Sequence, residues 1–308
     1  MSLGILITGS TGQIGWQLQR TLATLGDVTA CSRSELNFEH PSAVAKFVRQ
    51  MAADIVVNAA AYTAVDRAES DADVAHTVNA TTPGRIAEEL SRSGGLLVHY
   101  STDYVFPGDK SAAYDEQDAT GPINVYGRTK LEGEQAIVAS GCAYIILRTS
   151  WVFDIRGKNF LRTILRLARE KEELSIVGDQ YGSPTWARAI AEATAQIVGQ
   201  CIIARKASGW EDGGIYHLTA SGKTSWAGFA ADILRQYESL AEWAADTGEW
   251  GAPLAAKRIN RITTDQYPTL ARRPRNSVLS NAKLYETFGL RLPDWRDQLK
   301  LALQDAVR

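Results

Sequence analysis

The sequence is poor in cysteine and nearly neutral in charge. Its three cysteines, Cys31, Cys142 and Cys201, are far apart, odd in number and form no Cys-x-x-Cys pair. This excludes a disulfide framework or a thiolate metal cluster and favours a reducing compartment. Lys and Arg number 33 against 35 Asp and Glu, a formal charge of −2. The chain therefore has no overall basic field for nucleic acid or an anionic membrane surface.

Long hydrophobic runs are also missing. No window approaches the roughly 18 apolar residues of a membrane span, and the first residues do not form a charged segment followed by an apolar core, as a signal peptide does. We therefore expect a cytoplasmic protein that neither enters nor binds a membrane. What the sequence does have is 308 residues with 45% hydrophobic and 22% charged side chains. That is the composition of a globular chain of about two domains.

From residue 3 onward, short apolar runs alternate with amphipathic stretches of helical length. This alternation is typical of repeated βαβ units and predicts an α/β fold with a Rossmann-type, doubly wound parallel sheet. The expected strands are residues 3–8, 28–31, 54–58, 96–100 and 144–147. The expected helices are residues 13–25, 42–52, 72–93 and 126–139.

After Trp151 the alternation weakens, which predicts a second, smaller α/β lobe. Here we expect helices at 159–170, 187–199 and 226–237, a strand at 215–219, a Gly- and Pro-rich loop at 178–185 and a surface excursion at 239–253. We place the first domain at residues 1–150 plus about 185–213, and the second at 151–184 plus 214–308.

A glycine-rich turn joins the first expected strand to the first expected helix. Gly9, Gly12 and Gly15 follow the pattern G-x-x-G-x-x-G, and glycines are needed where a backbone turns tightly and approaches a pyrophosphate at a helix N-terminus. A tight turn required only for packing would also need glycine. The strand before the turn and the helix after it favour a dinucleotide site and an NAD(P)-binding first domain.

A second signal is Tyr126 and Lys130, four residues apart at the start of an expected helix. This spacing places both side chains on one helix face. A nearby ammonium favours the ionised form of a tyrosine and brings the phenol closer to acid–base work at neutral pH. An amphipathic helix with a surface lysine gives the same spacing. Residues 101–106 follow a strand end, where ligands bind in open α/β sheets, and could supply a hydroxyl to the same site.

Taken together, these motifs resemble the extended short-chain dehydrogenases/reductases. The shared segments are residues 9–15, 58–61 and 101–106 with the Tyr126 and Lys130 pair. Finer matches resemble the dTDP-4-dehydrorhamnose reductase family, whose members catalyse the last step of dTDP-L-rhamnose synthesis. They lie at residues 61–69, 148–152, 179–185 and 271–277. The resemblance runs from Ile5 to about Trp295 and implies NADPH, with NADH as a second cofactor, and a nucleotide-sugar substrate.

The resemblance also implies roles for single residues. Tyr126 would donate a proton to the substrate C4 oxygen, Lys130 would hold the nicotinamide ribose and lower the Tyr126 pKa, and Thr102 would hydrogen-bond the substrate oxygen. Asp103 and Trp151 would contact the substrate, although Trp151 could equally belong to the core. The residues implied along the cofactor, from pyrophosphate to adenine, are Gly12, Gln13, Ile14, Ala61, Tyr62, Thr63, Tyr100, Asn37 and Phe38.

Two sets of basic residues are further candidates. Arg272, Arg273 and Arg275 flank Pro274 and could clamp the substrate diphosphate, or form a solvated loop. Ser32 and Arg33 follow the second strand with no acid before Glu35, so nothing there is expected to repel a 2′-phosphate. They predict a preference for NADPH of roughly tenfold to hundredfold, or dual specificity if Arg33 points into solvent.

No metal site is predicted. The four histidines, His40, His76, His99 and His217, share no ligand spacing and are expected to be structural or surface residues. Some reductases of the resembled family form a homodimer bridged by Mg²⁺ through carboxylates, but the matching positions here carry Gln17 and Arg188. A guanidinium repels a cation, so we expect no bridging Mg²⁺. A shift of one helical turn would bring in Glu192, and a metal-free homodimer stays open.

Two other functions share this fold. An epimerase or dehydratase of the same superfamily returns the hydride to its substrate and tends to keep its cofactor bound. A non-catalytic subunit, such as a methionine adenosyltransferase regulatory subunit, has no need of the full Thr102, Tyr126 and Lys130 set, which this chain retains.

Overall fold

The main lobe is built on a six-stranded parallel sheet. The computed structural model describes residues 3–208, 213–241 and 248–307. The strand order is β10-β5-β4-β3-β1-β2, and all five pairings are parallel. The strands are β1 (Gly4–Thr8), β2 (Asp27–Cys31), β3 (Ile55–Asn58), β4 (Leu96–Thr102), β5 (Ala143–Thr149) and β10 (Gly214–His217). Strands β3 and β4 are buried along their whole length, as expected where helices cover both faces.

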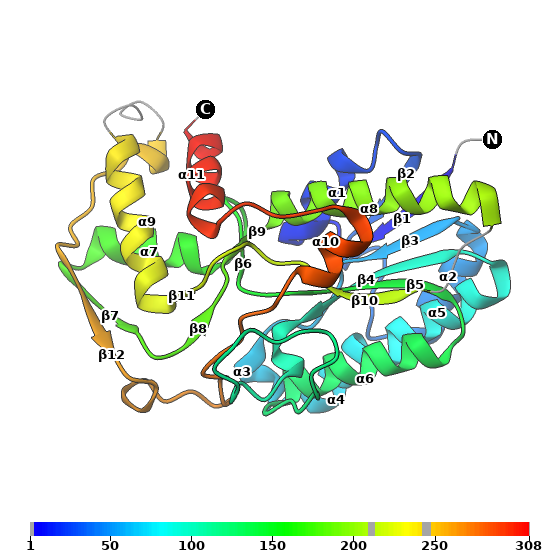
Figure 1. The fold of residues 1–308 in the computed structure, drawn as a ribbon, viewed down its shortest axis with the longest axis horizontal. Helices are drawn as coiled ribbons and strands as arrows, with labels where there is room; N and C mark the ends of the chain where they lie inside the picture. The colour runs from blue at the N-terminus through cyan, green and yellow to red at the C-terminus, as the bar shows by residue number, and fades with distance from the viewer. Residues whose placement is uncertain (1–2, 209–212, 242–247, 308) are drawn as a thin grey trace.

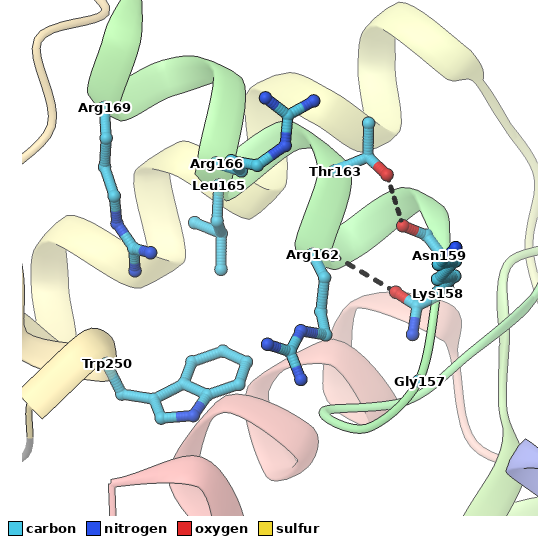
Figure 2. A pocket seen from close by; sticks show the side chains of 9 residues that line it. All are labelled: Gly157, Lys158, Asn159, Arg162, Thr163, Leu165, Arg166, Arg169 and Trp250. Carbon is cyan, nitrogen blue, oxygen red and sulfur yellow. Dashed lines mark hydrogen bonds between the residues drawn. The ribbon is translucent and has the colours of Figure 1, made fainter.

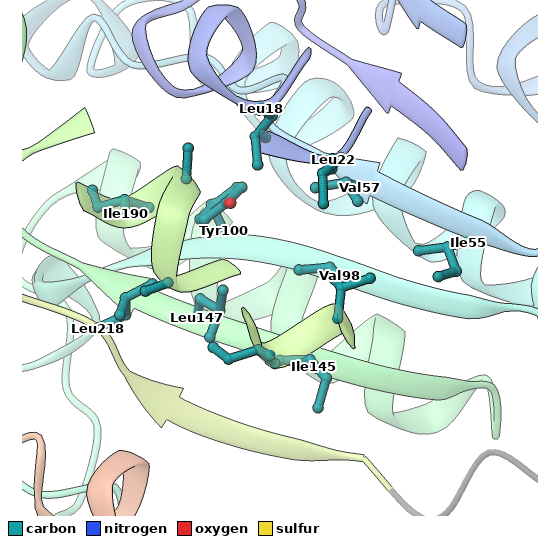
Figure 3. Close-up of a cluster of buried hydrophobic side chains, with 14 of the residues drawn as sticks. Leu18, Leu22, Ile55, Val57, Val98, Tyr100, Ile145, Leu147, Ile190 and Leu218 are labelled. Carbon is teal, nitrogen blue, oxygen red and sulfur yellow. The ribbon is translucent and has the colours of Figure 1, made fainter. Parts of the chain in front are cut away.

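Helices pack on both faces of this sheet (Figure 1). On one face, α1 (Gln13–Thr21) and α8 (Ala187–Ser208) pack together and bury Leu18 and Ile190 against Val57, Val98 and Leu147 of the strands (Figure 3). On the other face, α2 (Pro41–Met51), α5 (Thr82–Ser93) and α6 (Val125–Ala139) enclose a second apolar cluster with the strands. The doubly wound Rossmann-type fold is confirmed.

The helix expected at residues 72–93 is broken into three parts. They are α4 (Ala72–His76), a π-helical turn (Thr77–Thr81) and α5. The wider turn holds Asn79 fully buried, where its side chain accepts from Tyr62 N at 2.8 Å and donates to Tyr62 O at 3.1 Å. Asn79 also donates to Thr129 Oγ1 of α6. The turn therefore fixes the segment after β3 against α6, and α3 (Val65–Ala68) follows in that segment.

The smaller lobe has an apolar core of its own. Its helices are α7 (Phe160–Glu170), α9 (Trp226–Ala241) and α11 (Trp295–Ala306), which bury Leu161, Phe229 and Trp295 together. Its strands form three pairs: β6 (Val152–Phe153) with β9 (Thr185–Trp186), β7 (Glu173–Val177) with β12 (Arg258–Ile262), and β8 (Tyr181–Gly182) with β11 (Thr224–Ser225). Figure 1 shows this lobe beside the carboxyl ends of the main strands.

Short elements complete the chain. They are the single turns η2 (Asp103–Val105), η3 (Gly248–Gly251) and η4 (Thr264–Gln266), and the helix α10 (Ala282–Phe288). Two features differ from the division expected above. β10 pairs with β5 at the edge of the main sheet, and Leu284 of α10 packs into the main core. Part of the excursion at 239–253 lies outside the described residues. Within the described ranges, no helix is both long and apolar enough to cross a membrane.

Candidate active site

The glycine-rich turn lies where the order of the main strands reverses. β1 has β2 on one side and β3 on the other, and ligands bind at the carboxyl ends of strands at such a point. Gly9 has φ +70°, and a Cβ there would lie 2.7 Å from the carbonyl carbon of Ala59. A Cβ on Gly15 would lie 2.1 Å from Gly9 O. Gly12 is the N-cap of α1 and offers no side-chain cap, so the N–H groups of Gln13 and Ile14 remain open to an anion.

Thr102 and Tyr126 meet where β4 ends and α6 begins. Asn124 caps α6 by accepting from Gly127 N at 2.8 Å, and a Cβ on Gly127 would lie 2.1 Å from Tyr104 O. This close approach brings α6 against the segment after β4. The Tyr104 and Tyr126 rings pack edge to face with centroids 5.8 Å apart. The Thr102 hydroxyl donates to Asp103 Oδ1 at 2.9 Å and lies close enough to the Tyr126 phenol to oppose the rise in its pKa.

Lys130 takes a different position from the one expected. Burial raises the pKa of Tyr126 to about 12, with Thr102 opposing the rise and the Asp103 charge adding to it. Lys130 is not among these influences, because its Nζ donates to Tyr100 O at 2.6 Å and contacts His99 Nε2 at 3.1 Å. The expected lowering of the Tyr126 pKa by Lys130 is therefore absent from this arrangement of the side chains.

Asp103 is a buried carboxyl at the same strand end. Its side chain is 3% exposed, and Oδ2 has no hydrogen-bond partner within the described part of the chain. Burial raises its pKa to about 7, with nearby Ser277 and Thr102 opposing the rise. A buried oxygen without a partner is costly. Its position beside Thr102 and Tyr126 makes it available to a polar group of a ligand.

Trp151 has an uncommon backbone conformation just after the carboxyl end of β5. Its φ is +47°, a left-handed value that costs a bulky residue roughly 1–3 kcal/mol. The indole stacks on Trp226 of α9 with ring centroids 3.5 Å apart and planes 4° apart. A Cβ on Gly182 would lie 2.4 Å from the Trp151 ring. The sequence analysis missed Trp226, because a single aromatic residue at the start of a helix carries no local signal.

The arginine cluster divides between the site and the solvent. Arg272 and Arg275 are exposed, whereas Arg273 is partly buried and donates to Asp66 Oδ2 at 2.8 Å. Arg273 Nη1 is buried without a partner in the described ranges. With Tyr104, Phe160 and Trp226, Arg273 lines a cleft of about 640 Å³ that joins the two lobes. The solvated-loop alternative therefore fits Arg272 and Arg275 but not Arg273.

The residues expected along the cofactor and near its adenine lie partly in the core. Phe38 is 4% exposed and packs in the second apolar cluster of the main lobe. The Tyr100 hydroxyl bonds Thr194 Oγ1 of α8 at 2.7 Å. Contacts from Phe38 and Tyr100 to a ligand would therefore come from their backbones. Asn37 is partly buried and accepts from Glu39 N, and the segment of Ala61, Tyr62 and Thr63 is held by Asn79 and by Asp71, which accepts from the Tyr62 hydroxyl.

The end of β2 carries more negative charge than expected. Glu35 folds back so that its Oε2 accepts from Ser32 N at 2.8 Å and from Ser32 Oγ at 2.7 Å. Arg33 is exposed and forms an ion pair with Glu39. The Glu35 carboxylate therefore lies on the serine itself, and the expected size of the preference for NADPH stays a prediction.

The residues at the expected metal positions do not fit a cation. Gln17 Nε2 donates to Asp154 Oδ2 at 2.9 Å, and Arg188 forms ion pairs with Glu192 and Asp305. No group of three or more His, Cys, Asp or Glu among the described residues is arranged to hold a metal ion. Mg²⁺ requires several anionic or neutral oxygen ligands, and the Arg188 guanidinium occupies the carboxylates nearest to it.

A second cavity, of about 590 Å³, lies on α7 away from these residues (Figure 2). Lys158, Arg162, Arg166, Arg169 and Trp250 line it. It contains none of the residues predicted for the site. Arg166 is paired with Glu170, and Arg162 and Arg169 have partners of their own.

Comparison with known proteins identifies the family. A family model described as the RmlD substrate binding domain matches residues 3–308. The chain belongs to the dTDP-4-dehydrorhamnose reductase family. A reductase of this name from Burkholderia thailandensis is 52% identical and covers 98% of this chain and 99% of its own. One from Escherichia coli K12 is 44% identical, with 98% of each chain covered.

Solved structures of the family agree with the fold. A dTDP-4-dehydrorhamnose reductase from Bacillus anthracis, crystallised with NADP, is 32% identical and superposes with a TM-score of 0.85 over 99% of this chain and all of that one. The match covers both lobes of the reductase fold. Together with the curated relatives, it favours this family over the epimerase, dehydratase and regulatory-subunit alternatives.

Proposed function

We propose that this protein is a cytoplasmic, NAD(P)H-dependent reductase that converts the C4 ketone of dTDP-4-dehydro-L-rhamnose to the C4 hydroxyl of dTDP-L-rhamnose. The observation that carries the proposal is the convergence of Thr102 and Tyr126 at the carboxyl end of β4, with Lys130 one helical turn further along α6. The site lies at the same end of the sheet as the glycine turn after β1, where the strands have their carboxyl ends. The family membership supports both the reaction and the substrate.

The glycine turn suits a dinucleotide. Gly9 and Gly15 leave no room for a Cβ, and no side chain caps the first N–H groups of α1 at the helix N-terminus. When bound there, NADPH supplies the hydride for C4. Gly12, Gln13 and Ile14 would hold the pyrophosphate, and Ser32 with Arg33 would face the adenosine ribose.

Tyr126 would serve as the general acid. Hydride addition builds negative charge on the ketone oxygen, and a donor already fixed at that oxygen stabilises the transition state. The raised Tyr126 pKa keeps the phenol protonated at neutral pH, so the proton is present when the oxygen needs it. The Thr102 hydroxyl lies beside Tyr126, and on turning its proton from Asp103 Oδ1 to the substrate it would become a second donor to the same oxygen.

The cleft between the lobes would bind the nucleotide sugar. Asp103 Oδ2 and Arg273 Nη1 are buried polar atoms without partners among the described residues. A sugar hydroxyl and a phosphate oxygen are the groups that satisfy such atoms. We propose that Asp103 holds the sugar, that Arg273 holds the diphosphate, and that Trp226, with Trp151 stacked on it, forms an aromatic wall.

A direct spectrophotometric assay tests this function. The purified protein is mixed with NADPH and enzymatically prepared dTDP-4-dehydro-L-rhamnose, and the absorbance of the reduced nicotinamide is followed. We expect its decay to depend on both protein and ketosugar, with dTDP-L-rhamnose as the product. Formation of an epimer of the sugar without net oxidation of NADPH would instead indicate an epimerase.

A further inference from the structure

A buried hydrogen-bond chain runs from β1 to Lys130. The Thr8 hydroxyl donates to Asn58 Oδ1 at 2.8 Å, Asn58 Nδ2 lies 2.9 Å from His99 Nδ1, and His99 Nε2 lies 3.1 Å from Lys130 Nζ. All four side chains are at most 1% exposed. Water is therefore not available to correct a mismatch of donors and acceptors, and the proton positions must be consistent along the chain.

The Asn58 amide has one allowed orientation. The backbone N–H of Ala60 can only donate, and it lies 3.1 Å from Asn58 Oδ1. A flipped amide would place two donors against each other there. Asn58 Nδ2 therefore donates to His99, and His99 Nδ1 must be an acceptor without a proton.

This orientation determines the form of His99. A neutral imidazole whose Nδ1 accepts carries its proton on Nε2. A doubly protonated ring would place a second donor against Asn58 Nδ2, and burial holds the His99 pKa well below its usual value. The Nε2–H group therefore points at Lys130 Nζ, and an ammonium has no lone pair to accept it.

We infer that His99 is a positioning residue that favours the uncharged amine of Lys130 and so lowers the pH at which Lys130 takes up a proton. The amine accepts from His99 Nε2–H and donates to Tyr100 O. To act as a cation towards a cofactor or Tyr126, Lys130 must take up one proton from solvent and leave His99. The assignment of protons to His99 and Lys130 stands on these contacts alone. Its consequence for turnover rests on the proposed function.

The other charged groups around Lys130 agree with this inference. Glu134, one turn further along α6, is the carboxylate that faces Lys130. It is held by two hydrogen bonds from Arg148 of β5 and by the Ser101 hydroxyl of β4, so its charge is already compensated. Burial lowers the Lys130 pKa to about 8 even with Glu134 opposing the change. Tyr126, on the preceding turn, is neutral.

Nuclear magnetic resonance on the cofactor-free protein tests the proton count directly. The ¹⁵N shifts of His99 should show a protonated Nε2 and an unprotonated Nδ1. The ¹³Cε signal of Lys130, assigned by its loss in Lys130→Arg, should titrate at about pH 8 or below. A His99 ring protonated on Nδ1 instead would overturn the inference.

Asn58→Asp is the sharpest variant, because it is nearly isosteric. One oxygen of the new carboxylate still accepts from Ala60 N, and the other now accepts from His99 Nδ1–H. His99 Nε2 then carries no proton and can accept from the Lys130 ammonium. We expect the ¹⁵N pattern to reverse and the Lys130 midpoint to rise by about one pH unit or more. His99→Gln adds no charge and can turn its oxygen to Lys130, so its midpoint should rise too.

Thr8→Val is the matched control. It removes the Thr8 hydroxyl but leaves Ala60 N to orient the Asn58 amide, so the Lys130 midpoint should stay unchanged. Equal midpoints in the unmodified protein, Asn58→Asp and His99→Gln would refute the inference even if all three are folded and active.

Cofactor binding offers a second readout besides activity. Calorimetric titration with NADPH, in buffers of different ionisation enthalpy near the Lys130 midpoint, should show net proton uptake. Asn58→Asp, whose lysine is already charged, should show less. Failure of NADPH to bind would count against the proposed function alone, whereas binding without uptake and without a difference between the two proteins would count against the inference.

Discussion

At the scale of single residues, burial sets the chemistry of the site more strongly than neighbouring charge. Tyr126 and Asp103 have their pKa values raised, and Lys130 has its pKa lowered, in each case chiefly by burial. All three shifts favour the neutral form. The Tyr126 phenol therefore keeps its proton at neutral pH, and Asp103 and Lys130 change charge close to it.

Tyr126→Phe tests the general acid. The ring and its edge contact with Tyr104 remain, and only the hydroxyl is lost. We expect kcat to fall by at least about 10²-fold, because general acids contribute roughly 10²–10⁴ in rate, while the Kd for NADPH changes little. Steady-state kinetics and cofactor titration measure the two quantities. A variant that keeps most of its kcat would exclude Tyr126 as the acid.

Asp103 makes the free energy of unfolding depend on pH. The folded protein keeps the Asp103 proton up to about pH 7, whereas the unfolded chain releases it near the ordinary value of 3.8. Between these values the folded state binds more protons, so stability falls as pH rises, by up to a few kcal/mol. Asp103→Asn should lack this loss.

Urea unfolding at a series of pH values, on both proteins, checks the prediction for Asp103. The stability of Asp103→Asn relative to the unmodified protein should increase from about pH 4 to pH 7 and level off above it. A constant difference across this range would show that Asp103 is already ionised in the folded state.

At the scale of elements, the predictable parts are those whose apolar pattern is set by the sheet. The residues of β3 and β4 are buried on both faces of the sheet, so their continuous apolar runs identify these segments as strands. The glycine turn and the Tyr126 pair were predictable because a local spacing carries the chemistry. The π turn after α4 was not, since its cause is the distant contact of Asn79 with Tyr62.

The smaller lobe was harder to predict for a related reason. β6, β8, β9 and β11 have two residues each, too short for any periodicity, and each is defined by a partner far away in sequence. The strand expected at 215–219 was assigned to the second domain, whereas β10 joins the main sheet, because a four-residue strand does not reveal which sheet it joins. Trp226, His99 and Asn58 gave no local signal of their contacts with the site.

The turn after β2 makes a prediction about cofactor choice. Glu35 places its carboxylate on Ser32, beside the expected adenosine ribose site, where it would oppose a 2′-phosphate. Glu35→Gln should raise the ratio of kcat/KM for NADPH over NADH by roughly two- to fivefold. Glu88→Gln, which removes an exposed acid of α5, is the matched control. Equal ratios in both variants would mean that Glu35 does not face the phosphate.

At the scale of the whole molecule, two lobes with separate apolar cores meet at a cleft lined from both sides. Asp66 of α3 ties the arginine loop of the smaller lobe to the main lobe through Arg273 and Ala271 N. Asn124, which caps α6, also donates to Arg272 O. The elements that present Tyr126 and Arg273 are therefore connected directly, and we propose that the substrate binds across this junction.

Metal removal tests the molecule as an assembly. Gln17 binds Asp154, and Arg188 pairs with Glu192 and Asp305, so the expected bridging positions offer no site for Mg²⁺. Exhaustive chelation should leave both the reductase rate and the sedimentation mass unchanged. Loss of both, followed by recovery on adding Mg²⁺, would show that a metal bridges two copies.

The stacked pair of Trp151 and Trp226 gives the cleft an optical signature. Two indoles with centroids 3.5 Å apart and planes 4° apart share their electronic excitations, so they should produce a coupled band in near-ultraviolet circular dichroism and a quenched emission. The chain has eight tryptophans, and Trp226→Phe would isolate this contribution by difference. Because Trp226 also lines the cleft, a ligand that enters it should perturb the band, so the occupancy of the cleft could be followed without any added label.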